Sequence, residues 1–137
     1  MAFSATKPKT AETEKVTVNL GFVDLGHIDL LVAEGFYSNR TDFIRTAIRN
    51  QLCVQQEAVR QVVSRKSLVL GLQRFTRADL EALQRAGETL EVRVLGLATV
   101  DDDVSPELAS ATMASVTVLG AFHASPAVKQ ALQGRIQ

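Results

Sequence analysis

The chain has 137 residues, of which 46% are hydrophobic and 22% charged, and its 15 basic residues balance its 15 acidic ones. This length suits one domain or two small ones. No apolar run approaches the ~20 residues that span a bilayer, and a single cysteine excludes an internal disulfide framework. Residues 1–67 hold nine Lys and Arg against seven Asp and Glu, and residues 68–137 hold six against eight. Binding to an acidic partner would therefore depend on where the charges lie, not on their total.

The first periodic stretch is residues 15–20, which follows a tail, residues 1–14, without periodicity. Its residues alternate strictly between apolar and polar, which predicts a strand with two different faces. The apolar face holds Val16, Val18 and Leu20, and the polar face holds Lys15, Thr17 and Asn19. No hairpin partner follows in the sequence, and a strand with an unpaired edge is unstable. We therefore expect a second copy of the chain to supply the other strand of an antiparallel ribbon.

Two helices are expected after the strand. Asp24 is a candidate N-cap for the first, and Gly35 suits its left-handed end. Ser38 is a candidate N-cap for the second. The second helix has an apolar stripe at helical spacing, made of Phe43, Ile44, Ala47, Ile48 and Leu52. The helical pattern either continues to about residue 65 or breaks near Gln55 and resumes; the lone Cys53 is expected to pack inside it.

The alternating segment KVTVNL at 15–20, followed by GFYSNRTDFIRTAIR at 35–49, resembles ribbon–helix–helix DNA-binding domains. The resemblance covers residues 15–52 and implies an obligate intertwined dimer that binds double-stranded DNA. It implies a dimer core of Val16, Val18, Leu20, Phe43, Ile44 and Ile48. Bases would be read by Lys15, Thr17 and Asn19, since a two-stranded ribbon fits the major groove, Lys can donate to guanine and Asn can pair with adenine. Phosphate would bind at the start of the second helix, where free backbone amides attract anions, through Ser38, Asn39, Arg40 and Thr41.

The C-terminal half contains an internal repeat. Three similar apolar segments, at 68–72, 92–97 and 116–121, contain Gly71, Gly96 and Gly120. The first two glycines are 25 residues apart and the last two 24. Each segment is followed by a helix-start signal, at Thr76, at Ser105 before proline and at Ser125 before proline. This predicts about three strand–loop–helix repeats that stack into a parallel, solenoid-like sheet. The last strand, with Val116 and Val118, would form an exposed edge able to meet another subunit.

The sequence contains no recognisable catalytic motif. Asp101, Asp102 and Asp103 lack the ligand spacing of a calcium loop and are expected to form a solvated loop. His123 is expected in a loop that corresponds to Thr99, and with His27 and one cysteine it gives no zinc or nickel pattern. No nucleophile–base pair, P-loop or dinucleotide fingerprint is present. We expect no enzyme activity, no metal and no cofactor.

The sequence thus predicts an α+β protein with a tail at 1–14, a ribbon–helix–helix domain at 15–67 and a parallel β/α repeat domain at 68–137. We expect a homodimeric, sequence-specific transcriptional regulator, a repressor, in the cytoplasm at the nucleoid, with no membrane attachment. Higher oligomers could form through residues 68–137. Two alternatives remain: an antitoxin whose C-terminal part holds a toxin, and an architectural protein that organises DNA through its repeats.

Overall fold

The computed structural model describes residues 13–137, which form two compact units that divide between Glu57 and Ala58. The predicted tail lies almost wholly outside the described residues, and the predicted domain boundary after residue 67 stays a prediction. None of the helices between residues 13 and 137 is long and apolar enough to cross a membrane.

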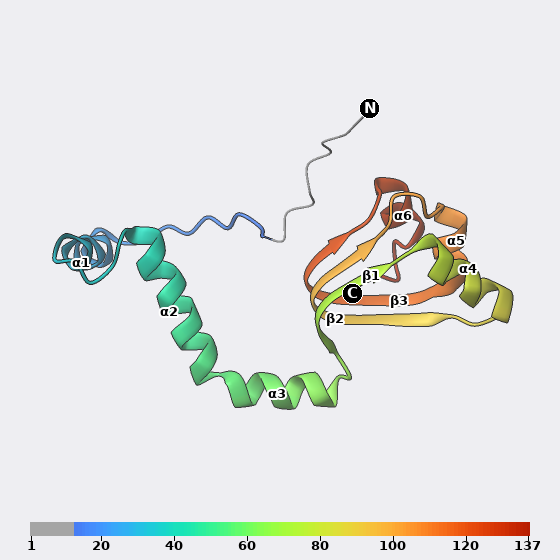
Figure 1. The fold of residues 1–137 in the computed structure, drawn as a ribbon, viewed down its shortest axis with the longest axis horizontal. Coiled ribbons are helices and arrows are strands. Elements are labelled where there is room, and N and C mark those ends of the chain that lie inside the picture. Colours follow the sequence, from blue (N-terminus) through green and yellow to red (C-terminus); the bar gives the residue numbers. More distant parts are fainter. Residues whose placement is uncertain (1–12) are drawn as a thin grey trace. The chain divides into compact units, whose positions relative to one another are not determined.

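The first unit contains an extended segment and two helices (Figure 1). Residues 13–21 form no helix and pair with no strand among the described residues. Helix α1, Phe22–Ala33, begins after Gly21, which is its N-cap. The prediction of Asp24 as N-cap was wrong: the Gly21 carbonyl already accepts the Leu25 amide, at 3.0 Å, so Asp24 lies inside the first turn.

Gly35 follows the end of α1 in a left-handed conformation, as predicted, with a φ of 84°. The Phe36 amide reaches back to the Leu31 carbonyl at 3.0 Å, as left-handed glycine ends allow. Helix α2, Arg40–Val54, is followed by α3, Gln56–Arg65, so the predicted break at Gln55 is confirmed over the continuous helix. Cys53 lies in α2, as predicted, but its thiol is exposed, so the prediction of a packed thiol was wrong.

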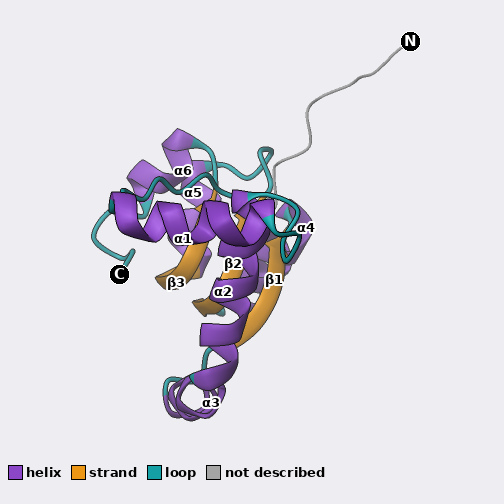
Figure 2. Ribbon diagram, turned by 90° about the vertical axis from the view of Figure 1, so that its left-hand side faces the viewer, coloured by secondary structure: helices purple, strands orange, loops and turns teal. Residues whose placement is uncertain are grey.

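The second unit alternates strands and helices. Its strands β1, Val69–Phe75, β2, Leu90–Val100, and β3, Met113–His123, are all parallel and lie side by side in that order (Figure 2). Between and after them come α4, Arg77–Ala86, α5, Pro106–Thr112, and α6, Pro126–Ala131. The three helix starts predicted from the sequence are confirmed: Thr76, Ser105 and Ser125 each accept a backbone hydrogen bond as N-caps.

The repeat glycines lie in one row across the sheet, Gly71 beside Gly96 and Gly96 beside Gly120. Their φ angles are 122°, 140° and 121°, a conformation that only glycine adopts easily. A Cβ at Gly96 would overlap the carbonyl oxygen of Gly71, and a Cβ at Gly120 would overlap that of Gly96. The strands bend sharply (Figure 1), as expected of strands interrupted by glycine.

Burial alternates along the strands and divides the sheet into two faces. One face packs against the helices and holds the core, which consists of Leu80, Val92, Val94, Ala98, Val100, Val104, Leu108, Ala109, Met113, Val116, Val128 and Leu132. The opposite face carries two rows that are in register, Leu70–Leu95–Leu119 and Leu72–Leu97–Ala121. Leu70 and Leu72 at the β1 edge are 71% and 65% exposed.

Two local predictions about this unit were wrong. Val116 is fully buried in the core, and the C-terminal segment returns beside β3 and pairs Ile136 with it. Thr99 and His123 do correspond to each other, but they pair between β2 and β3 and do not lie in loops. The α+β class and the parallel sheet agree with the prediction, whereas the intertwined dimer and the solenoid stay predictions.

Candidate nucleic-acid interface

The described part of the first unit contains an open groove of about 770 Å³. Its walls come from the extended segment and from facing sides of α1 and α2. All six residues of the predicted dimer core line it: Val16, Val18, Leu20, Phe43, Ile44 and Ile48. The sequence prediction therefore selected one continuous surface, although its role as a dimer core stays a prediction.

The apolar side chains of this groove face solvent in the single chain. Val16 is 75% exposed, Val18 68% and Ile48 54%. Among residues 13–57, Ile28 alone is buried. Covering a side chain of this size contributes roughly 1.5–3 kcal/mol, and a unit this small with one buried residue cannot offset the entropy of folding by itself. Most of the apolar surface of the described part of the first unit is therefore uncovered in the single chain.

The polar side of the extended segment carries the predicted base-reading residues. Lys15, Thr17 and Asn19 are all exposed, and Thr17 also borders the groove. Their backbone is extended and pairs with no other described segment, so its amides and carbonyls are available to a second strand.

The start of α2 is closed by a reciprocal pair of hydrogen bonds. The Asn39 side-chain oxygen accepts the Asp42 amide at 2.8 Å, and the Asp42 carboxylate accepts the Ser38 amide at 2.9 Å. Asn39 is thus the N-cap, and the prediction of Ser38 in that role was wrong. Ser38 precedes the cap, and its own amide is the one held by Asp42.

Arg40, the first residue of α2, forms a two-pronged ion pair with Asp29 of α1. Its Nε lies 2.8 Å from Oδ1 and its Nη2 2.8 Å from Oδ2. The hydrogen bond from Arg40 holds the pKa of Asp29 below its ordinary value of 3.8 and raises the pKa of Arg40. Sequence reasoning missed this pair, because the partners are 11 residues apart and belong to different helices.

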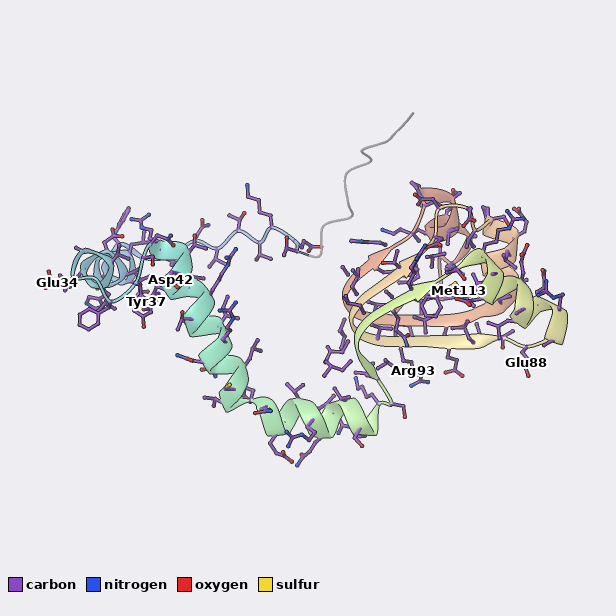
Figure 3. The ribbon with its side chains drawn as sticks, in the orientation of Figure 1. Glu34, Tyr37, Asp42, Glu88, Arg93 and Met113 are labelled. Atoms are coloured by element: carbon purple, nitrogen blue, oxygen red, sulfur yellow. The ribbon has the colours of Figure 1, made fainter. Side chains whose placement is uncertain are left out.

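Aromatic packing fixes the turn between the two helices. The rings of Tyr37 and Phe43 meet edge to face, with centroids 5.0 Å apart. Tyr37 and Asp42 lie close to the first turn of α2 (Figure 3). The four predicted phosphate-binding residues, 38–41, therefore belong to one ordered helix start, whose phosphate binding stays a prediction.

Comparison with known protein families gives a match over residues 11–129 to the model of the ribbon-helix-helix transcriptional regulator family. The chain belongs to this family. The match extends past residues 15–52, where the sequence resemblance lies, and runs through the repeat unit into α6. No curated protein and no solved structure matches the chain.

In the repeat unit of this ribbon-helix-helix regulator, the first residue of the acidic run, Asp101, forms an ion pair. Arg74 of β1 holds the Asp101 carboxylate with two hydrogen bonds of 2.7 and 2.8 Å. Between residues 13 and 137, no group of three His, Cys, Asp or Glu side chains is arranged to hold a metal ion. The Nδ1 of His123 is buried without a hydrogen-bond partner in the described structure.

Proposed function

We propose that this regulator is a homodimeric, sequence-specific DNA-binding repressor that acts in the cytoplasm at the nucleoid. The observation that carries the proposal is the uncovered apolar groove, which joins the extended segment to α2. Between residues 13 and 57, one side chain alone is buried. A second copy offers the matching surface, because each chain has both an apolar strand face and a groove to receive one.

In the proposed dimer, residues 15–20 of the two chains pair as an antiparallel ribbon. Pairing turns Val16, Val18 and Leu20 into the groove, and it turns Lys15, Thr17 and Asn19 outward. A two-stranded ribbon fits the ~12 Å width of the major groove. Lysine then donates to guanine O6 and N7, and asparagine forms its two hydrogen bonds with adenine N6 and N7. Repression follows where the bound dimer occupies a promoter.

The start of α2 is proposed to fix the ribbon against the DNA backbone. Asn39 and Asp42 satisfy two of the donors there, which leaves the amides of Arg40 and Thr41 and the hydroxyls of Ser38 and Thr41 for a phosphate. Arg40 contributes once its guanidinium turns from Asp29, which its exposure allows, since 56% of its side chain is accessible to solvent. Such contacts supply salt-dependent affinity without sequence preference.

The dimer is tested by placing a charge in the groove. Ile48→Lys puts an ammonium among the groove's apolar side chains and should convert the dimer to monomers with little helix. Val54→Lys is the matched control, because Val54 is 73% exposed at the end of the same helix and does not line the groove. Sedimentation velocity and circular dichroism measure both effects. A dimer that survives Ile48→Lys would contradict the proposed interface.

DNA reading is tested by a mobility-shift titration on the DNA upstream of the protein's own coding region, with scrambled DNA as competitor. Replacing Lys15, Thr17 and Asn19 together with alanine should abolish the preference for the native fragment. Arg85→Ala, on the exposed face of α4, removes the same single positive charge and should leave binding unchanged. Equal binding of wild type to both DNAs would refute sequence-specific reading and support the architectural alternative.

Arg40→Ala should weaken binding to both DNAs alike, whereas Asn19→Ala should reduce only the preference for the native fragment.

The antitoxin alternative has less support, because the C-terminal half is a folded repeat unit with its own core, and antitoxin tails of this type are usually disordered until a toxin binds them. Co-purification of a small protein from native cells would favour it.

A further inference from the structure

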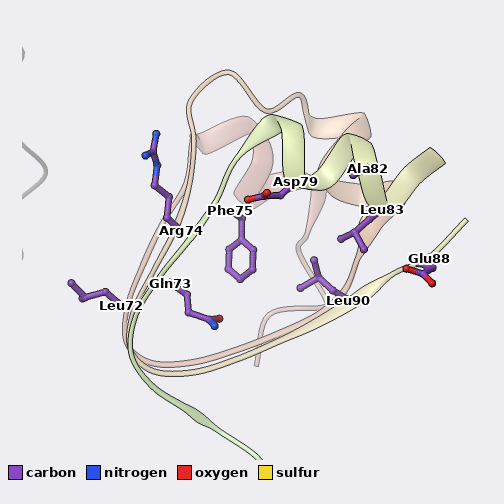
Figure 4. Close-up of a pocket in the computed structure, with 9 residues that line it drawn as sticks. All are labelled: Leu72, Gln73, Arg74, Phe75, Asp79, Ala82, Leu83, Glu88 and Leu90. Atoms are coloured by element: carbon purple, nitrogen blue, oxygen red, sulfur yellow. The ribbon is translucent and has the colours of Figure 1, made fainter. Parts of the chain in front are cut away.

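The repeat unit has an uncovered end at β1. This strand pairs with β2 on one side and with no described residue on the other. A hollow of about 690 Å³ lies beside it, between β1, α4 and the start of β2. Phe75, Leu83 and Leu90 extend toward this hollow, and polar side chains, among them Gln73 and Asp79, also line it (Figure 4). Repeat proteins need a polar cap on their terminal repeat, whereas this end leaves Leu70 and Leu72 exposed.

Gly71 shows what kind of surface the β1 end presents. At Gly96 and Gly120, the place of a Cβ is filled by the carbonyl oxygen of the glycine in the preceding strand. At Gly71 the same place is empty, with nothing within 4 Å. The free side of β1 therefore resembles the side of β2 that faces β1 and the side of β3 that faces β2. At β1, however, no described strand lies against that side.

The opposite end of the unit is only partly covered. Residues 135–137 run beside the start of β3: the Val116 amide donates to the Arg135 carbonyl at 2.9 Å and the Gln137 amide to the Val116 carbonyl at 2.8 Å. From Val118 onward, the far side of β3 pairs with no residue that the structure describes. Through the register of the sheet, Val118 corresponds to Val94 and Val94 to Val69, the first residue of β1.

The two ends are thus complementary in length and register. Strand β1 has seven residues and β3 has eleven. Residues 135–137 pair with β3 at Val116, which lies before any counterpart of β1. The rows that remain open on β3 begin where β1 would begin.

We propose that the repeat units of different chains join head to tail, with β1 of one copy stacking in parallel on the open rows of β3 of another. Gly71 then lies beside the neighbour's Gly120, whose carbonyl oxygen fills the empty place at Gly71. Leu70 extends the leucine row through the neighbour's Leu119. The contact buries the apolar end of the unit. Because it joins two different surfaces, each pair of joined copies keeps a free β1 and a free β3, so the contact can add further copies. This inference goes beyond DNA binding and does not rest on it.

Register-specific disulfides test the stacking. In a Cys53→Ser background of the full chain, Leu70→Cys and Leu119→Cys are introduced together. Within one chain these positions lie two strand spacings apart, about 9.6 Å, and a disulfide needs Cα atoms within about 7 Å. Between stacked copies they are neighbours. Mild oxidation of the double variant without DNA should give trimers, tetramers and longer species on a non-reducing denaturing gel.

Three controls make the result decisive. Leu70→Cys alone and Leu119→Cys alone should each give monomers; a covalent dimer from Leu70→Cys alone would show that β1 pairs with itself and would overturn the proposal. Leu70→Cys with Thr117→Cys moves one thiol two rows along β3 and should cross-link at least ten times more slowly. Equal ladders from both pairs would also overturn the proposal.

Sedimentation velocity of the unmodified protein gives an independent measurement. The average mass should rise beyond that of a dimer as concentration increases, and it should do so equally for the Lys15/Thr17/Asn19 alanine variant. A constant dimer mass over the whole range would overturn the stacking and would leave the DNA-binding proposal untouched.

Discussion

Alanine substitution at two glycines of the same row separates backbone strain from contact between strands. Gly71 and Gly96 both have positive φ angles, 122° and 140°, so alanine at either costs about 1–3 kcal/mol in backbone strain. At Gly96 the new Cβ would also overlap the Gly71 carbonyl. That oxygen belongs to the neighbouring strand and cannot move without displacing β1 from β2.

We therefore expect Gly71→Ala to lower the melting temperature of the repeat unit by roughly 4–8 °C for each kcal/mol lost. Gly96→Ala should cost more than about 4 kcal/mol and abolish the cooperative transition. Thermal unfolding followed by far-ultraviolet circular dichroism measures both, at protein concentrations where sedimentation shows a single species. Equal destabilisation by the two substitutions would refute the argument that the glycine row is required by close approach of the strands.

Three further predictions concern single interactions. Because hydrogen bonding to Arg40 lowers the pKa of Asp29, the contact between them should persist above pH 3.8 and be lost as the pH falls through the lowered pKa of the folded state. Carboxyl NMR titration should show Asp29 titrating below pH 3.8. A midpoint at the ordinary value would exclude the ion pair in solution. Thr76→Ala removes the cap of α4 and should lower the free energy of chemical unfolding by about 0.5–2 kcal/mol. Because hydrogen bonds with Thr76 lower the pKa of Asp79, this pKa should return toward its ordinary value in the variant. An unchanged titration of Asp79 would count against the capping box. Leu80 is fully buried, so Leu80→Ala should cost about 2–5 kcal/mol, and a loss under 1 kcal/mol would argue that this core is loosely packed.

Local features of the fold could be read from the sequence because they depend on neighbouring residues. Thr76, Ser105 and Ser125 cap helices as predicted, since a hydroxyl next to a helix start reaches the amide three residues on. The same reasoning failed at α2, where Ser38 and Asn39 are adjacent candidates. There the Asn39 side chain accepts the Asp42 amide, and the Asp42 carboxylate accepts the Ser38 amide, so Asn39 is the N-cap.

Features that depend on distant residues could not be read in this way. The pairing of Arg40 with Asp29 arises because α1 and α2 fold back on each other, and no spacing rule links residues 11 positions apart in different helices. Val116 was expected at an exposed edge, yet its side chain lies in the core and the C-terminal residues pair beside it.

The sequence by itself determined the periodic parts of this protein: the alternating segment at 15–20, the apolar stripe of α2 and the glycine spacing that places three strands in one register. These follow from side-chain periodicity, which is a property of consecutive residues. Only the tertiary structure decided which surfaces remain uncovered, namely the groove of the first unit and the β1 end of the second. Burial depends on how all the elements pack together, and no segment carries that information alone.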